Sequence, residues 1–202
     1  MPLSPPVDRE KQHTRTVTVD GYRRADGLFD IEGHLVDTKT YGFPNTDRGR
    51  IEAGEPLHGM WLRLTIDGDM LIHAAEAVTD HGPFTICKDI NPAFDTLAGL
   101  RIGPGFRKQV RERLGGAHGC THLVELLLGP MATTAFQTLY AERERQGRAG
   151  DSAGPGGRPR ILDTCHALAS DSPVVKRQWP QWYTGPETDA DTAETEPVSG
   201  DR

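Results

Sequence analysis

Residues 60–78 read MWLRLTIDGDMLIHAAEAV, and the predicted fold is built around this segment. Met60, Leu62, Leu64 and Ile66 recur at every second position, which is the pattern of a strand with one buried face. Asp67-Gly68-Asp69 then supplies a tight turn, and an extended run resumes from Met70 to Val78. We therefore predict an antiparallel hairpin here.

Strand patterns precede this hairpin and helical patterns follow it. Alternation predicts strands at Thr14–Val19 and Leu28–Thr38. Apolar residues at helical spacing predict helices at Asn91–Leu100, Gly105–Leu114 and Cys120–Tyr140, the last kinked or split by Gly129-Pro130. Strands first and helices afterwards indicate an α+β fold, an antiparallel sheet with helices packed on one face.

The composition divides the 202 residues into one domain with less ordered flanks. Segments without large apolar residues are expected to stay unfolded, because they bury too little surface to offset the entropy of ordering. The expected parts are a disordered N-terminus (1–12), an α+β main body (13–145), a flexible Gly-rich loop (146–160), a C-terminal segment packed on the body (161–185) and a disordered acidic tail (186–202).

The charge and the hydropathy pattern exclude several classes of partner. The net charge of -6 disfavours nucleic acid, whose binding requires a basic face. The longest apolar run, Leu123–Leu128, is interrupted by Glu125 and is far shorter than the about 20 residues that span a bilayer. The first residues, MPLSPP, lack the features of a secretory signal. We therefore expect a cytoplasmic protein that binds neither nucleic acid nor membrane.

Three cysteines and several histidines are the residues that indicate chemistry. An odd number of cysteines in a reducing compartment favours thiols or metal ligands over disulfides. No two cysteines are spaced as CxxC, so a zinc ribbon or finger is not supported, and a site has to assemble from distant segments. The candidate ligands are His58, Cys87, His118, Cys120, His122, Cys165 and His166.

Cys120 has the most suggestive surroundings among these candidates. It follows Gly119 at an expected helix start, where the helix dipole favours a thiolate, and His122 lies two residues further on. Cys165 and His166 are adjacent, and because neighbouring side chains diverge in extended backbone, we expect only one of the two to coordinate. Lone cysteines also occur as small buried apolar residues, and this alternative stays open.

A separate polar set lies along the strand at Leu28–Thr38. Asp30, Glu32, His34 and Asp37 would offer carboxylates and an imidazole for general acid–base catalysis. Alternation predicts the same residues as the solvated face of an antiparallel strand, and we favour that interpretation.

Four segments resemble a bacterial family known only as a domain of unknown function, the one numbered 2889. These are GYRRADGLFDIEGHLVDTKTY (21–41), AGEPLHGMWLRLTID (53–67), GCTHLVELL (119–127) and MATTAFQ (131–137). The resemblance covers about residues 10–183 and implies no activity, so the function has to be argued from the residues.

The order of elements over about residues 54–140 also resembles the iron-sulfur scaffold proteins of the SufU, IscU and NifU type. In those proteins one cysteine precedes a hairpin, a second follows it and a third opens a later helix. His58, Cys87 and Cys120 occupy these positions here, with histidine at the first. The resemblance implies a SufU/NifU-like fold with zinc, iron or an iron-sulfur cluster at these three residues, with His122 or a water as fourth ligand and Cys165 in reserve.

Three classes of function follow from these observations. The first is a metal-binding protein, for zinc, iron or an iron-sulfur cluster, that acts in assembly or transfer. The second is a small metal-dependent enzyme of bacterial catabolism, a lyase or hydrolase, with its base or anion-binding group among Arg63, Asp89, His118 and Glu125. The third is a binding or regulatory module without metal. A protein partner, a small-molecule substrate and a homodimer all stay open.

Overall fold

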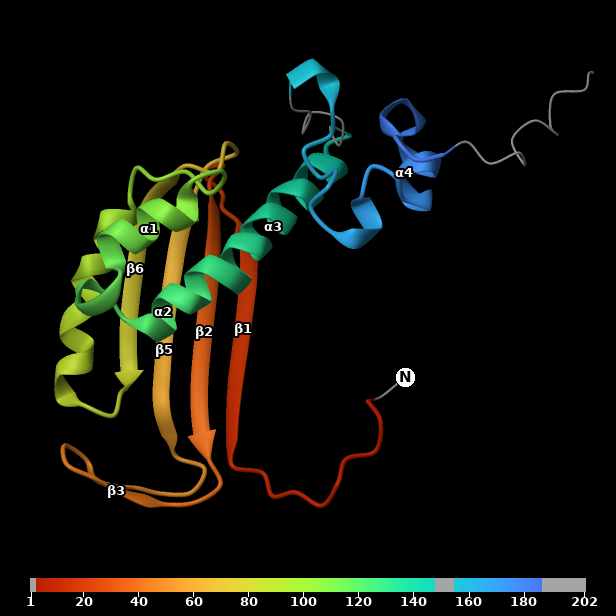
Figure 1. The fold of residues 1–202 in the computed structure, drawn as a ribbon. Helices are drawn as coiled ribbons and strands as arrows, with labels where there is room; N and C mark the ends of the chain where they lie inside the picture. Colours follow the sequence, from red (N-terminus) through yellow and green to blue (C-terminus); the bar gives the residue numbers. More distant parts are fainter. Residues whose placement is uncertain (1–2, 148–154, 187–202) are drawn as a thin grey trace, which may run out of the picture. The chain divides into compact units, whose positions relative to one another are not determined.

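The computed structural model describes residues 3–147 and 155–186 (Figure 1). Contacts divide the chain into two compact units, Met1–Glu142 and Arg143–Arg202. Residues 3–12 have no regular secondary structure. The expected acidic tail from residue 187 and most of the expected Gly-rich loop lie outside the described residues.

The first unit is built on a four-stranded antiparallel sheet. Its strands are β1 (His13–Arg23), β2 (Phe29–Lys39), β5 (Pro56–Ile66) and β6 (Ile72–His81), in the spatial order β1-β2-β5-β6. A separate two-stranded hairpin, β3 (Phe43–Asn45) and β4 (Gly49–Ile51), is inserted between β2 and β5. The expected strands and the antiparallel sheet are confirmed.

The turn between β5 and β6 is closed by the side chain of Asp67. Its Oδ1 accepts hydrogen bonds from the backbone N–H groups of Asp69 (2.8 Å) and Leu71 (3.0 Å). Met70 has a φ of 66° in this turn. A carboxylate that satisfies backbone donors within its own turn is typical of aspartate in tight turns.

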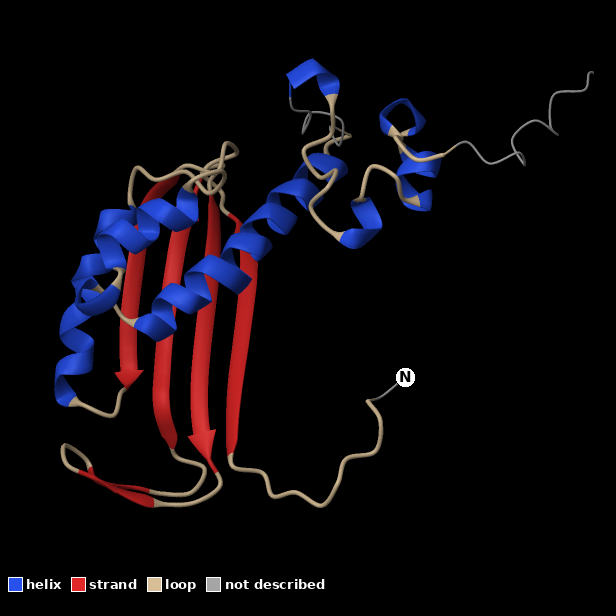
Figure 2. Cartoon of the chain, in the orientation of Figure 1, coloured by secondary structure: helices blue, strands red, loops and turns tan. Residues whose placement is uncertain are grey.

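Helices follow the sheet along the chain, as the sequence predicts (Figure 2). In the first unit the helical segments are η1 (Thr85–Leu97, 3-10), α1 (Phe106–Leu114), η2 (Gly116–His118, 3-10), α2 (Thr121–Leu126) and η3 (Leu127–Met131, π). The next helix, α3 (Ala132–Arg145), begins in the first unit and ends just past its boundary at Glu142. In the second unit they are η5 (Pro155–Gly157), η6 (His166–Leu168), α4 (Pro173–Gln178) and η7 (Pro180–Trp182).

The helix expected at Cys120–Tyr140 is divided by one π turn around Pro130. A proline inside a helix has no N–H to donate, and its ring clashes with the carbonyl four residues earlier. The wider π turn accommodates that clash while the chain continues in helical form. The interruption expected at Gly129-Pro130 is present, and its form is a π turn.

The core lies between one face of the sheet and the helices, which cover that face in Figure 1. Alternate residues of the central strands are buried on this side: Phe29, Ile31 and Leu35 from β2, and Met60, Leu62, Leu64 and Ile66 from β5. Gly33 interrupts the row, and a Cβ there would lie 2.8 Å from the sulfur of Met131. The missing side chain lets the π turn approach the sheet closely, so the α+β arrangement with helices on one face is confirmed.

The second unit has a small buried set of its own. Leu162 and Val175 are buried, and the Ser172 hydroxyl caps α4 by accepting a hydrogen bond from the backbone N–H of Val175. The expected packing of residues 161–185 on the body stays a prediction, since the arrangement of the two units is not determined. Among the described residues, no helix combines the length and apolar character that crossing a bilayer requires.

Candidate functional site

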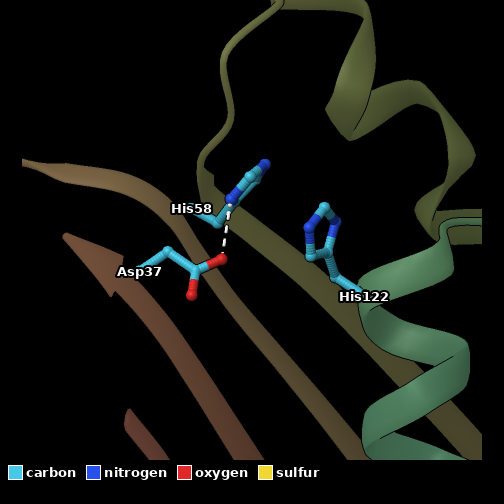
Figure 3. A group of neighbouring side chains, drawn as sticks. All are labelled: Asp37, His58 and His122. Atoms are coloured by element: carbon cyan, nitrogen blue, oxygen red, sulfur yellow. Dashed lines mark hydrogen bonds and ion pairs between the residues drawn. The ribbon is translucent and has the colours of Figure 1, made fainter. Parts of the chain in front are cut away.

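Three side chains from three elements meet at one end of the sheet (Figure 3). Asp37 near the end of β2 is the cross-strand partner of His58 near the start of β5, and His122 comes from the first turn of α2. One ligand atom from each of the three lies within 4.8 Å of the others. Antiparallel pairing accounts for this convergence, since it sets the end of β2 beside the start of β5.

Asp37 is the centre of a hydrogen-bond network. Its side chain is 1% exposed. Oδ1 accepts from Arg15 Nε at 2.8 Å and lies 3.1 Å from His13 Nε2, while Oδ2 accepts from Arg15 Nη2 at 2.8 Å and lies 2.9 Å from His58 Nδ1. A carboxylate has about four lone-pair positions, so these four nitrogens saturate it.

The charge of this buried carboxylate is stabilised by its partners. Burial by itself would raise the pKa of Asp37. The hydrogen bonds and positive charge of Arg15, together with hydrogen bonds from His58 and His13, outweigh burial and lower the pKa from 3.8 to about 2. Asp37 is therefore ionised at neutral pH, and it can hold a proton-bearing nitrogen of His58 in place.

The rings of His58 and His122 face each other, with centroids 3.9 Å apart and planes inclined by 36° (Figure 3). Burial lowers the pKa of His58, and the neighbouring His122 lowers it further, although Asp37 acts in the opposite direction. Burial also lowers the pKa of His122, and the charge of Arg15 adds to that effect. Both shifts favour the neutral imidazole, which is the form in which histidine binds metal.

Each of the two rings has one nitrogen engaged and one nitrogen open. His58 Nδ1 lies 2.9 Å from Asp37, and His122 Nδ1 lies 3.8 Å from the Sγ of Cys120. Neither Nε2 atom has a hydrogen-bond partner among the described residues. In the same part of the chain, every fully buried side-chain nitrogen or oxygen does have a partner. The two Nε2 atoms are consequently not fully buried, and each could bind a metal ion through its lone pair.

The rim of the site carries charged groups with greater exposure. Nη1 of Arg15 lies 3.3 Å from Oε2 of Glu125, whose side chain is 62% exposed. Glu125 follows His122 by three residues on α2, so the two share one face of that helix. His13 is 40% exposed. An acid–base group is thus available beside the two histidines.

Two of the five expected metal ligands, His58 and His122, belong to this cluster, and a third borders it. Cys120 is the N-cap residue of α2, as expected, and its Sγ contacts His122 and the Sδ of Met60 at 3.8 Å. Cys87 lies in η1 against Gly82 and is not part of the three-residue group. Cys165 is exposed in the second unit, whose position relative to the site is not determined.

The role of Asp37 was missed because the sequence interpretation grouped it with Asp30, Glu32 and His34. Those three lie on the opposite face of β2, whereas Asp37 shares the parity of Ile31 and Leu35 and lies on the helix-covered face. Strict alternation would have found it: an aspartate at a buried parity position requires partners.

The open face of the sheet has the paired, solvated character that we favoured for it. Asp30 accepts from the Thr65 hydroxyl, Glu32 from Arg63, and the ring of His34 stacks on Trp61 with centroids 3.7 Å apart. Two further candidate bases, Asp89 and His118, are exposed and lie outside the group of three.

Comparisons with known proteins give one match. The family model described as a protein of unknown function (DUF2889) matches residues 13–137, which include β1 through the first part of α3 and all three members of the cluster. No curated protein and no solved structure matches significantly.

Proposed function

Because the chain belongs to the DUF2889 family, whose function is unknown, its role has to be argued from the site, and we propose that it binds one divalent metal ion, zinc or iron(II). The ligands are Nε2 of His58 and Nε2 of His122, with the remaining positions open to water, substrate or a partner. Neutral imidazole suits both metals.

One observation carries this proposal: two imidazoles face each other with their Nδ1 atoms engaged and their Nε2 atoms open. When a histidine binds metal through one ring nitrogen, the N–H of its other ring nitrogen usually donates a hydrogen bond to a carboxylate, a carbonyl or water. This hydrogen bond fixes the orientation of the ring and raises its basicity. Asp37 supplies this carboxylate to His58. It acts as a positioning residue, because its lone pairs are already occupied.

The ligand set favours a single ion over an iron-sulfur cluster. Clusters are held mainly by thiolates, and Cys120 is the one cysteine that contacts either histidine among the described residues. The SufU/NifU-like arrangement predicts Cys120 and Cys87 as direct ligands, and this stays the alternative ligand set. Open coordination positions and solvent-accessible donors are properties of a site that can release its ion to a partner, which favours assembly or transfer.

A small metal-dependent enzyme, a lyase or hydrolase, is the second candidate. Glu125, one helical turn from His122, favours it, since an exposed carboxylate beside an open coordination position could accept a proton from a bound water. If the protein passes zinc to a chelator and turns over no ester or amide, the result supports the first candidate, metal transfer, over the second. A third class, a module without metal, corresponds to failure of the test below.

The test is anaerobic titration of the full chain with Zn²⁺ and Fe²⁺ followed by elemental analysis. We expect one ion per chain, lost in His58→Ala and in His122→Ala. Asp37→Asn should weaken binding by about 10- to 100-fold without abolishing it, because it removes an orienting carboxylate. The matched control is His73→Ala, which removes the histidine of another Asp–His pair, 3.0 Å from Asp67, and should bind like the wild type.

Two outcomes would contradict or revise the proposal. A folded wild type that binds neither ion, or His58→Ala and His122→Ala variants that bind as the wild type does, would eliminate the metal site. Substitution with Co²⁺ tests the ligand set, because a thiolate ligand adds an intense charge-transfer absorption. Its presence in the wild type and its loss in Cys120→Ser would replace the two-histidine set with one that includes Cys120.

A further inference from the structure

The two edges of the sheet differ in how they are protected. η1 packs along β6, so that edge is covered by another part of the chain. β1 forms the opposite edge and extends over 11 residues, nine of which are exposed, all except Thr14 and Val19 (Figure 1). Strands usually run to five or six residues, and edge strands are usually shorter still.

β1 also lacks two features that normally block an exposed edge, a proline and a β-bulge. It contains no proline, and its pairing with β2 runs in continuous register from His13↔Lys39 to Arg23↔Phe29 without a bulge. Its helix-side charges are already paired, Arg15 with Asp37 and Arg23 with Glu142. Its outer backbone groups therefore present a regular template for another strand.

We propose that β1 pairs with β1 of a second copy of the chain around a two-fold axis perpendicular to the sheet. The product is a continuous eight-stranded antiparallel sheet with the helices of both copies on the same side. This inference is independent of the metal proposal.

The sequence of β1 is what favours a second copy as the partner. An antiparallel pair centred on Val17 sets Val17 opposite itself and Thr16 opposite Thr18 of the copy. Cross-strand pairs of β-branched residues and of threonines are favourable. The same register sets Asp20 opposite Thr14 and Arg15 opposite Val19, so no like charges oppose each other between residues 13 and 21 of the new ladder. A two-fold axis needs only this one self-complementary strand.

The experiment measures the mass of the full chain by light scattering across a concentration series. We expect a dimer that dissociates in the double variant Thr16→Lys/Thr18→Lys, which sets lysines opposite each other across the axis. Both threonines are exposed, and their β2 partners are Val36 and His34. The matched control is Ala74→Lys/Val78→Lys, which adds the same charge to the same face at β6 and should stay dimeric.

Hydrogen exchange supplies the second readout. In the dimer every β1 amide near Val17 is bonded, either to β2 or to the second copy, so all exchange slowly. In the lysine variant only alternate amides, those bonded to β2, should stay protected. A monomeric wild type at all concentrations, or a dimer unchanged by the lysines, would overturn the proposal. So would a monomer whose β1 amides are all protected, because another segment of the chain would then cover the edge.

Discussion

At the residue scale, the most informative group is the buried carboxylate of Asp37. A buried charge is tolerated only when it is paired and hydrogen-bonded, and this one receives all the partners that its geometry allows. Its partner residues His13, Arg15 and His58 come from the strands on either side of β2. The network therefore ties three strands together at the end of the sheet where the histidines meet.

This network predicts an acid-dependent loss of stability. The pKa of Asp37 is about 2 in the folded chain against 3.8 as the ordinary value, so the stabilisation is complete above pH 3.8 and is lost as the pH falls through 2. Its size is on the order of 2 kcal/mol. Urea unfolding of the wild type and of Asp37→Asn measures it.

The two proteins should differ most near neutral pH and converge in acid, since asparagine does not titrate. A difference in unfolding free energy that stays constant between about pH 6 and about pH 2.5 would show that the carboxylate charge contributes nothing to stability.

At the scale of elements, the close approach of the π turn to β2 positions α2 and hence His122. Gly33 makes this approach possible, because a Cβ at that position would lie 2.8 Å from Sδ and 2.9 Å from Cγ of Met131. Leu126 lies next to it, with a methyl carbon 3.1 Å from the same point. The two helix segments around Pro130 thus depend on one glycine in the facing strand.

Gly33→Ala should destabilise the protein by about 1–3 kcal/mol, the usual cost of overpacking a filled core. Thermal or urea unfolding checks this value. Gly68→Ala in the turn between β5 and β6 is the control, because a Cβ there meets no atom within 4 Å and the φ of Gly68 lies outside the left-handed region. This variant should be neutral or stabilised by up to about 1 kcal/mol. Equal behaviour of the two variants would contradict close packing at Gly33.

At the scale of the whole molecule, one hydrophobic core supports the site. Its buried members run from Phe29 to Leu139, and neither Leu162 nor Val175 of the second unit belongs to it. The three clustered residues also belong to the first unit, so the fold that assembles them is complete within it.

A fragment of residues 1–147 should therefore unfold cooperatively and keep the metal affinity of the full chain. Differential scanning calorimetry and zinc titration test both expectations. An unfolded or aggregating fragment would show that residues after 147 complete the core, and a folded fragment without zinc affinity would place a ligand, with Cys165 as the first candidate, in the second unit.

The class of fold could be predicted from the amino-acid sequence alone, because strand and helix periodicities are local properties. The hairpin around Asp67, the cap position of Cys120 and the break at Pro130 could all be read from a few neighbouring residues. His58 and His122 could be named as candidates from residue type alone. Which candidates meet depends instead on long-range contacts, namely the strand register and the approach of α2 across Gly33. These contacts bring His58 next to Asp37, 21 positions earlier in the chain, and next to His122, 64 positions later.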